Sequence, residues 1–409
     1  MLKFKKRKNP FFSGTSVLAI QCSNNGDGNF AVFCKDKRLY YGNEASGFDS
    51  ITVIENIGVR NHPIKIYCHH PYICVSEQYG LNAAVINVNE GVASKLARKD
   101  SQNGVSSYSI GFLECSGRTL LLYQTQYNRL DIIDLSTWQL ITPRSVYYGW
   151  TGEMYFNGRR LRKRIAGVNY INYRHSLLSI SPDSKSFLSN GWGVPPEDNI
   201  LFFETSLFLK DFEPSRKLLG YSGREVWDRP CTFVGNDMFV IAADAFAIDS
   251  SLEFSDISHE SIHQLLFYKI SEVKSGIFAK SISTGLGAQL ATCSKNIPCD
   301  VFTYNSYGQI TGGELHFDHE SGHLIALSEK GAFELSLDGE TISSDYSIRL
   351  NKNTSAIRGI YKWGSRPRLL NWQYDATNRV FYRFYNGIIE KRAFGSKRLD
   401  ADTIWKNIH

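Results

Sequence analysis

The chain has 409 residues, of which 42% are hydrophobic and 21% are charged, a balance that supports a packed core and excludes wholesale disorder. Its 22 tyrosines, 25 phenylalanines and 33 glycines favour strands joined by tight turns. Residues 3–8 and 159–164 carry five bases each, and subtracting these ten charges from the formal net charge of +6 leaves −4 for the rest, so two short basic segments lie on a mildly acidic body.

The first predicted segment is a basic tail over residues 1–12. A polar stretch with Asn9-Pro10 follows the bases, where a signal peptide would have an apolar core. No apolar run in the sequence reaches the roughly 18 residues that a membrane-spanning helix needs. Several of the eight cysteines fall in strand-like runs, which is typical of small buried side chains in a reducing compartment. We therefore expect a cytoplasmic protein without a membrane span.

Seven similar ten-residue windows follow along the chain. Most combine an extended apolar run, a small polar turn and a second short run, which predicts two strands joined by a tight connection. They begin at Lys37, Asn82, Arg129, Asn199, Gln264, Gly331 and Gly387. Upstream of each window lies a turn rich in Asn, Asp, Gly, Ser or Pro and then another apolar strand, as in SPDSKSFLS at 181–189 and DATNRVFYRF at 375–384.

The combined unit predicts four antiparallel strands, repeated about seven times. This is the pattern of a single all-β propeller of about seven four-stranded blades, which we place at residues 13–398, with a tail at 399–409. The windows are 45 and 47 residues apart at first and 56 to 70 apart later, which predicts long face insertions near 145–172, 244–262 and 281–312. Predicted blade limits are 13–58, 59–101, 102–143, 144–215, 216–282, 283–345 and 346–398. Either residues 11–14 or the tail after residue 395 would complete the last sheet.

The fourth unit carries a resemblance to a known group of proteins. Residues 173–204, YRHSLLSISPDSKSFLSNGWGVPPEDNILFFE, and WDRP at 227–230 resemble the core of bacterial WD-repeat-like propellers of poorly characterised function. The Gly-His and Trp-Asp dipeptides of true WD repeats do not recur blade after blade, so their hydrogen-bond network is not carried over. The resemblance implies a propeller that acts as an interaction platform, and it names no ligand.

The basic segment at 159–164 is the best-motivated interaction site. Together with nearby aromatic residues, it could bind an acidic protein, or the phosphates and bases of a nucleic acid. It could also be a solvated hairpin whose charges protect an exposed edge from aggregation. The candidate partner-binding residues are Arg159, Arg160, Arg162, Lys163, Arg164, Trp150 and Tyr155.

The most specific chemical motif is H-E-S-I-H at residues 259–263. On a helix, His259 and His263 would share one face and bind zinc, with Glu260 as general base. However, the residues from Gln264 onward fit the repeat window, which predicts that the motif is a loop entering a strand. The same residues also fit a helical stripe, so this alternative stays open.

From these patterns we expect a non-catalytic platform that binds another protein, acidic in character, and needs neither a cofactor nor a metal. Two alternatives stay open. One is an enzyme, either a zinc hydrolase built on residues 259–263 or a propeller glycosidase or lyase. The other is a nucleic-acid-binding protein that uses the two basic segments.

Overall fold

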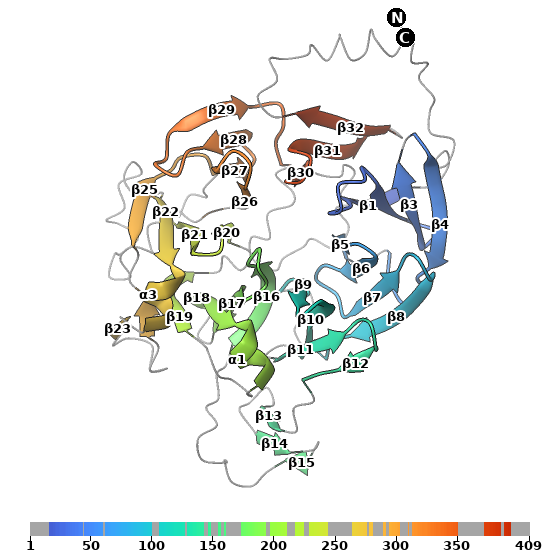
Figure 1. Cartoon of the computed structure of the whole chain (residues 1–409), viewed down its shortest axis with the longest axis horizontal. Helices are drawn as coiled ribbons and strands as arrows, with labels where there is room; N and C mark the ends of the chain where they lie inside the picture. Colours follow the sequence, from blue (N-terminus) through green and yellow to red (C-terminus); the bar gives the residue numbers. More distant parts are fainter. Residues whose placement is uncertain are drawn as a thin grey trace, which may run out of the picture.

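Antiparallel sheets arranged in a ring form the body of the molecule, as Figure 1 shows for this computed structural model. Their backbone order confirms a propeller of seven blades, with the first strand of each blade nearest the centre of the ring. The structure describes residues 16–43, 45–59, 62–99, 106–126, 129–142, 173–193, 197–210, 217–224, 229–243, 264–275, 294–302, 310, 313–350, 372–385 and 388–393, and five short strands at 146–148, 154–156, 159–160, 278–280 and 289–291.

The blades contain the following strands. Blade 1 has β1 (Val17–Cys22), β2 (Phe30–Cys34), β3 (Arg38–Asn43) and β4 (Gly47–Val53), and blade 2 has β5 (Ile64–His69), β6 (Tyr72–Glu77), β7 (Asn82–Asn87) and β8 (Val92–Ala97). Blade 3 has β9 (Ile110–Cys115), β10 (Arg118–Gln126), β11 (Arg129–Asp134) and β12 (Gln139–Leu140), and blade 4 has β16 (Tyr173–Ile180), β17 (Ser186–Gly193), β18 (Glu197–Glu204) and β19 (Lys217–Arg224). Blade 5 has β20 (Cys231–Val234), β21 (Met238–Ala243), β22 (Gln264–Lys269) and β25 (Lys295–Pro298). Blade 6 has β26 (Glu314–Asp318), β27 (His323–Leu327), β28 (Ala332–Leu335) and β29 (Thr341–Asp345), and blade 7 has β30 (Gln373–Asp375), β31 (Val380–Tyr385) and β32 (Ile388–Ala393).

The repeat windows coincide with the third strand of every blade. The windows at Asn82, Arg129 and Gln264 begin on the first residue of β7, β11 and β22, and the other four begin within two residues of their strands. Each upstream turn likewise leads into a second strand. These strands read as continuous apolar runs because neighbouring blades cover both faces of each sheet. All of β2 and all of β6 are buried, for example.

The core therefore lies between blades and not within one layer. The joint between blades 7 and 1 is one such contact, because Tyr382 and Ile389 of blade 7 pack with Ile20, Phe30 and Val32 of blade 1. The backbone N–H of Cys22 also donates to the hydroxyl of Tyr382 at 3.0 Å. This joint closes the ring between its first and last blades. Residues 11–14 and the tail after residue 395 lie outside the described residues.

Strand direction gives the ring two distinct faces. One face carries the turn between the first and second strands of each blade and the connection between the third and fourth, and we call it the turn face. The other carries the turn between the second and third strands and the connection from each blade to the next, and we call it the insertion face. The connections at 143–172 and 244–263 both leave from the insertion face, because they follow a fourth and a second strand respectively.

Two predicted blade limits and one predicted insertion are wrong. Blade 4 runs past residue 215, because helix α1 (Thr205–Lys210) separates its third strand from β19. Blade 5 runs past residue 282, because helix α3 (Ile270–Ser275) and the hairpin of β23 (Phe278–Lys280) and β24 (Gln289–Ala291) precede β25. The extra residues near 281–291 thus belong inside blade 5, and the sequence pattern missed this because β25 is four residues long.

Within the described residues, no helix is both long and apolar enough to cross a membrane. The cysteines that the structure describes are all free thiols, four of them buried. The tails at 1–12 and 399–409 lie outside the described residues.

Candidate interaction surfaces

Hydrogen bonds join the first turns of neighbouring blades on the turn face. The side chain of Asn24 in blade 1 reaches His69 and His70 in blade 2, and His69 Nε2 lies 2.5 Å from Glu114 Oε1 in blade 3. The backbone N–H of Glu114 donates to Ser184 Oγ in blade 4 at 2.9 Å. These contacts tie the first four blades together close to the axis of the ring.

The contacts around His69 fix its neutral tautomer. The backbone N–H of His70 donates to Asn24 Oδ1, which leaves the Asn24 amide nitrogen facing His69 Nδ1 at 3.2 Å. Nδ1 must then accept a hydrogen bond, so the ring proton is on Nε2, where it is donated to Glu114.

We therefore expect nitrogen-15 spectra of the histidine side chains at neutral pH to give a protonated Nε2 and an unprotonated Nδ1 for His69. Asn24→Leu removes the donor to Nδ1 and should shift the Nδ1 signal while leaving the fold intact. A proton on Nδ1 in the unmodified protein would contradict this assignment.

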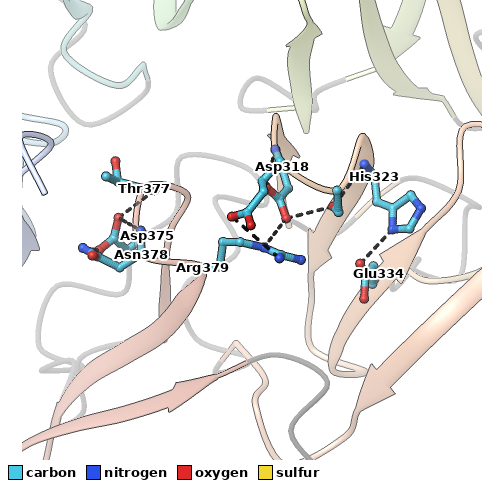
Figure 2. A network of polar contacts seen from close by, with 9 residues as sticks. Asp318, His323, Glu334, Asp375, Thr377, Asn378 and Arg379 are labelled. Atoms are coloured by element: carbon cyan, nitrogen blue, oxygen red, sulfur yellow. Dashed lines mark hydrogen bonds and ion pairs between the residues drawn. The ribbon is translucent and has the colours of Figure 1, made fainter.

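The turn face continues with an ion pair between blades 6 and 7, shown in Figure 2. Arg379 Nε lies 2.6 Å from Asp318 Oδ2, and the Asp318 side chain is 1% exposed. Asp318 also accepts hydrogen bonds from Ser321 Oγ and from the backbone N–H of Glu320. Burial alone would raise the pKa of Asp318, but these donors and the Arg379 charge outweigh burial and hold the pKa below its usual range.

A second aspartate, Asp375, joins neighbouring blades where blade 7 meets blade 1. Asp375 accepts hydrogen bonds from the backbone N–H groups of Thr377 and Asn378 in its own turn, as Figure 2 shows. Cys22 Sγ donates to Asp375 Oδ2 from blade 1 at 2.9 Å. Burial, followed by the hydrogen bond to Asp375, raises the pKa of the Cys22 thiol well above its ordinary value, so this thiol is a donor and not a nucleophile.

Buried polar side chains hold the connections of the first blades on the insertion face. Glu77 accepts hydrogen bonds from the backbone N–H groups of Gly58 and Leu81, which belong to two different connections. Arg98 is 2% exposed and donates to the carbonyl of Gly80 and to Gln124 Oε1, at 2.8 and 2.6 Å. The blade-to-blade connections described here are therefore fixed in place.

The basic segment begins in a small sheet outside the ring of blades. Strands β13 (Val146–Tyr148), β14 (Met154–Phe156) and β15 (Arg159–Arg160) form this sheet in the connection between blades 3 and 4 (Figure 1). The register places Tyr147 opposite Tyr155, and Tyr155 opposite Arg160. Two predicted site residues, Tyr155 and Arg160, are thus brought together. Arg159 is exposed, whereas Trp150, Arg162, Lys163 and Arg164 lie outside the described residues.

The H-E-x-x-H motif, with His259, Glu260 and His263, also lies outside the described residues. The residues directly after it form strand β22 (Gln264–Lys269), as the repeat predicts, so a helix through the motif does not continue into residues 264–269. Among the residues that the structure describes, no group of three or more His, Cys, Asp or Glu side chains is placed to hold a metal ion.

Two further short stretches of the sequence gather ligand-type side chains, Cys68 to Cys74 and His316 to His323, and the fold gives their members different contacts. His316 contacts Glu314, whereas His323 contacts Glu334. Cys68 and Cys74 pack in different hydrophobic clusters on the two sides of blade 2. Strand alternation sends them apart, as expected for paired strands.

Sequence reasoning missed the residues that link the turn face. Asn24 lies in a turn as the local pattern predicts, whereas Asp318 and Asp375 are the last residues of β26 and β30, directly before their turns. Their contacts with the next blade join positions as far as 353 residues apart. The only sequence signal is the recurrence of Asn or Asp at the corresponding turn of several blades.

Comparisons with known proteins give similar solved structures but no matching family. No protein-family model matches the sequence, and no curated protein matches it either. Among solved structures, the WD40 domain of Neurospora crassa Pan2 is similar at 9% identity and a TM-score of 0.45, covering 91% of this chain and 87% of that one. The Dos1 propeller is similar at 8% identity and a TM-score of 0.48, covering 93% of this chain and 78% of that one. What the sequence and the structure together establish for this chain is the fold, a seven-bladed β-propeller.

Proposed function

We propose that the protein is a non-catalytic interaction platform that binds another protein on the insertion face of its propeller. The observation that supports this most directly is the connection at 143–172, which leaves from the insertion face and carries the small sheet with part of the basic segment. The connection at 244–263 leaves from the same face. On the turn face, the turns between first and second strands are short and bonded to one another, and the longer connections there carry α1 in blade 4 and α3 with β23 and β24 in blade 5. Binding residues are concentrated on loops that a rigid scaffold positions.

The described connections on the insertion face supply that rigidity. Buried Glu77 and Arg98 hold the chain at the ends of blades 1, 2 and 3. A partner that docks there meets a prepared surface and loses less free energy to ordering than it would on a mobile one. The basic residues near 159–164 favour a partner with an acidic surface, because charge complementarity raises the association rate and excludes wrong partners.

The test is affinity capture with the tagged full-length protein from an extract of its native cells, at moderate salt. We expect one protein to be retained in a stoichiometric amount. Arg159→Glu combined with Arg160→Glu should reduce its retention at least about tenfold, because two attractive charges become repulsive. Mass spectrometry and gel densitometry identify and quantify the retained protein.

The matched control is Lys95→Glu combined with Lys185→Glu, which changes the net charge equally on the outer edge of blade 2 and on the turn face. This variant should retain the partner fully. Absence of a stoichiometric protein would contradict the proposal, and near-stoichiometric zinc in the purified protein would favour the hydrolase based on residues 259–263.

A further inference from the structure

His69 connects three blades through the two nitrogens of one ring. Its Nε2 donates to Glu114 of blade 3 at 2.5 Å, and its Nδ1 accepts from the Asn24 amide of blade 1 at 3.2 Å. The ring also stacks on Phe112 of blade 3, with the ring centroids 5.3 Å apart. The His69 side chain is 25% exposed, so it exchanges protons with solvent. Both ring nitrogens are bonded while the ring is neutral.

The Asn24 side chain is bonded to blade 2 through both of its polar atoms. Its Oδ1 accepts from the backbone N–H of His70 at 3.0 Å, while its amide nitrogen faces His69. An amide oxygen only accepts and an amide nitrogen only donates, so the two bonds together fix which way the amide points. Asn24 itself is exposed, which leaves its side chain room to turn.

Protonation of His69 makes this arrangement impossible. A charged imidazole has a donor at both nitrogens, so Nδ1 and the amide nitrogen of Asn24 would face each other as two donors. Turning the amide over offers Oδ1 to Nδ1 but directs the amide nitrogen toward the N–H of His70. One of the two bonds between Asn24 and blade 2 is therefore lost. Hydrogen bonds from a charged donor are about twice as strong as neutral ones, so the bond to His70 is the one given up.

The charged groups around His69 set the direction of the response. Glu114 carries the only charged group bonded to it among the residues that the structure describes. Asp27, in the same turn as Asn24, accepts from the hydroxyl of Tyr41, which also lies 3.4 Å from Nδ1 of His70. Imidazoles ordinarily gain their proton at a higher pH than carboxylates do, at about 6.5 against about 4.3. On mild acidification the contact with blade 3 thus becomes an ion pair, while the contact with blade 1 has to rearrange.

We propose that His69 and Asn24 form a pH-sensitive switch on the turn face, in which protonation of His69 turns the Asn24 amide over and releases the N–H of His70. Acid then strengthens the link between blades 2 and 3. It leaves the first turn of blade 1 held to blade 2 through Asn24 by one hydrogen bond in place of two. The switch lies on the face opposite the proposed partner surface and does not depend on that proposal.

The test is solution NMR of the full-length protein with nitrogen-15 in its histidines, titrated across the range of about pH 5 to 8 in which histidines change charge. The same label reports the ring nitrogens of His69 and the backbone amide of His70. We expect the His70 amide proton to move upfield, as a lost hydrogen bond requires, with the same midpoint as the His69 ring signals.

Two variants separate the parts of the switch. His69→Phe keeps an aromatic ring beside Phe112 but cannot titrate, so the His70 amide should lose this response. Asn24→Asp offers an acceptor to both donors at once, so the His70 amide should stay bonded throughout, and the His69 ring should stay protonated to a higher pH. Thermal unfolding at neutral pH confirms that both variants are folded.

Three results would overturn the switch. The first is a His70 amide signal that stays constant while the His69 ring titrates. The second is an equal response in His69→Phe, because titration of the His70 ring itself would then be the cause. The third is a response that persists unchanged in Asn24→Asp, because the amide would then not be the part that moves.

Discussion

Replacing Arg98 with methionine is expected to lower the free energy of unfolding by about 3–5 kcal/mol. This is the typical cost of removing one partner of a buried charged interaction and leaving the other partner without a hydrogen bond. The Arg98 side chain donates to the carbonyls of Gly80, Ser106 and Ser107 and to Gln124 Oε1, and its guanidinium lies 5.0 Å from the ring of Tyr108. Methionine fills much of the volume but donates nothing to these buried oxygens. Chemical denaturation followed by tryptophan fluorescence measures the loss.

Two further variants make this result specific. Arg98→Lys keeps the charge but not the planar fork of donors, so it should recover only part of the lost stability. Lys99→Met changes the next residue, which is exposed, and should cost less than about 0.5 kcal/mol. A cost below about 1 kcal/mol for Arg98→Met would show that the guanidinium does not hold the connection between blades 2 and 3.

Asp318→Asn is expected to destabilise the protein by about 2–3 kcal/mol at neutral pH, because hydrogen bonds and an ion pair to a buried carboxylate lose their charge. The effect depends on pH with a definite sign. The folded-state pKa of Asp318 lies below its unfolded value, so the ionised form stabilises the fold fully above the unfolded pKa of about 3.9, and this contribution is lost as pH falls through the folded pKa. The difference in the free energy of unfolding between the unmodified protein and Asp318→Asn should therefore become smaller below about pH 4.

Glu320→Gln is the matched control for this experiment. Its carboxylate lies 3.8 Å from Arg379 in the same cluster but is 77% exposed, so its removal should have little effect at any pH. The measurement is the free energy of unfolding of the unmodified protein, Asp318→Asn and Glu320→Gln, taken from denaturation curves between neutral and acidic pH. A gap between the unmodified protein and Asp318→Asn that stays constant down to pH 3 would rule out the ionised carboxylate as its source.

The strand repeat could be predicted from sequence because it is local. A continuous apolar run such as FAVFC in β2 follows from burial on both sides, and its turns follow from the residue types that tolerate turn conformations. The end of blade 5 could not be predicted in this way. Its fourth strand is short and comes after a helix and a hairpin, so the composition near residue 295 carries no periodic signal.

The candidate sites could be predicted only as residue types. Sequence reasoning selected Tyr155 and Arg160, but only the pairing register shows that the two stand opposite each other on neighbouring strands. The turn-face contacts were out of reach for another reason. Asp318 ends strand β26 and Arg379 lies in a turn, and nothing in the local sequence links the two before the ring brings blades 6 and 7 together.

The joint between blades 7 and 1 has a consequence for how the chain folds as it is made. Cys22 and Asp375 are separated by 353 positions, so at 5–20 residues per second their meeting waits for about 20 to 70 s of synthesis. During that interval blade 7 has not been made, so the apolar surface of blade 1 that contains Ile20, Phe30 and Val32 is not covered by it. Ring closure is therefore the last long-range step of folding. A ribosome that stalls before residue 382 leaves a partial ring whose exposed apolar surface on blade 1 can aggregate unless a chaperone binds it.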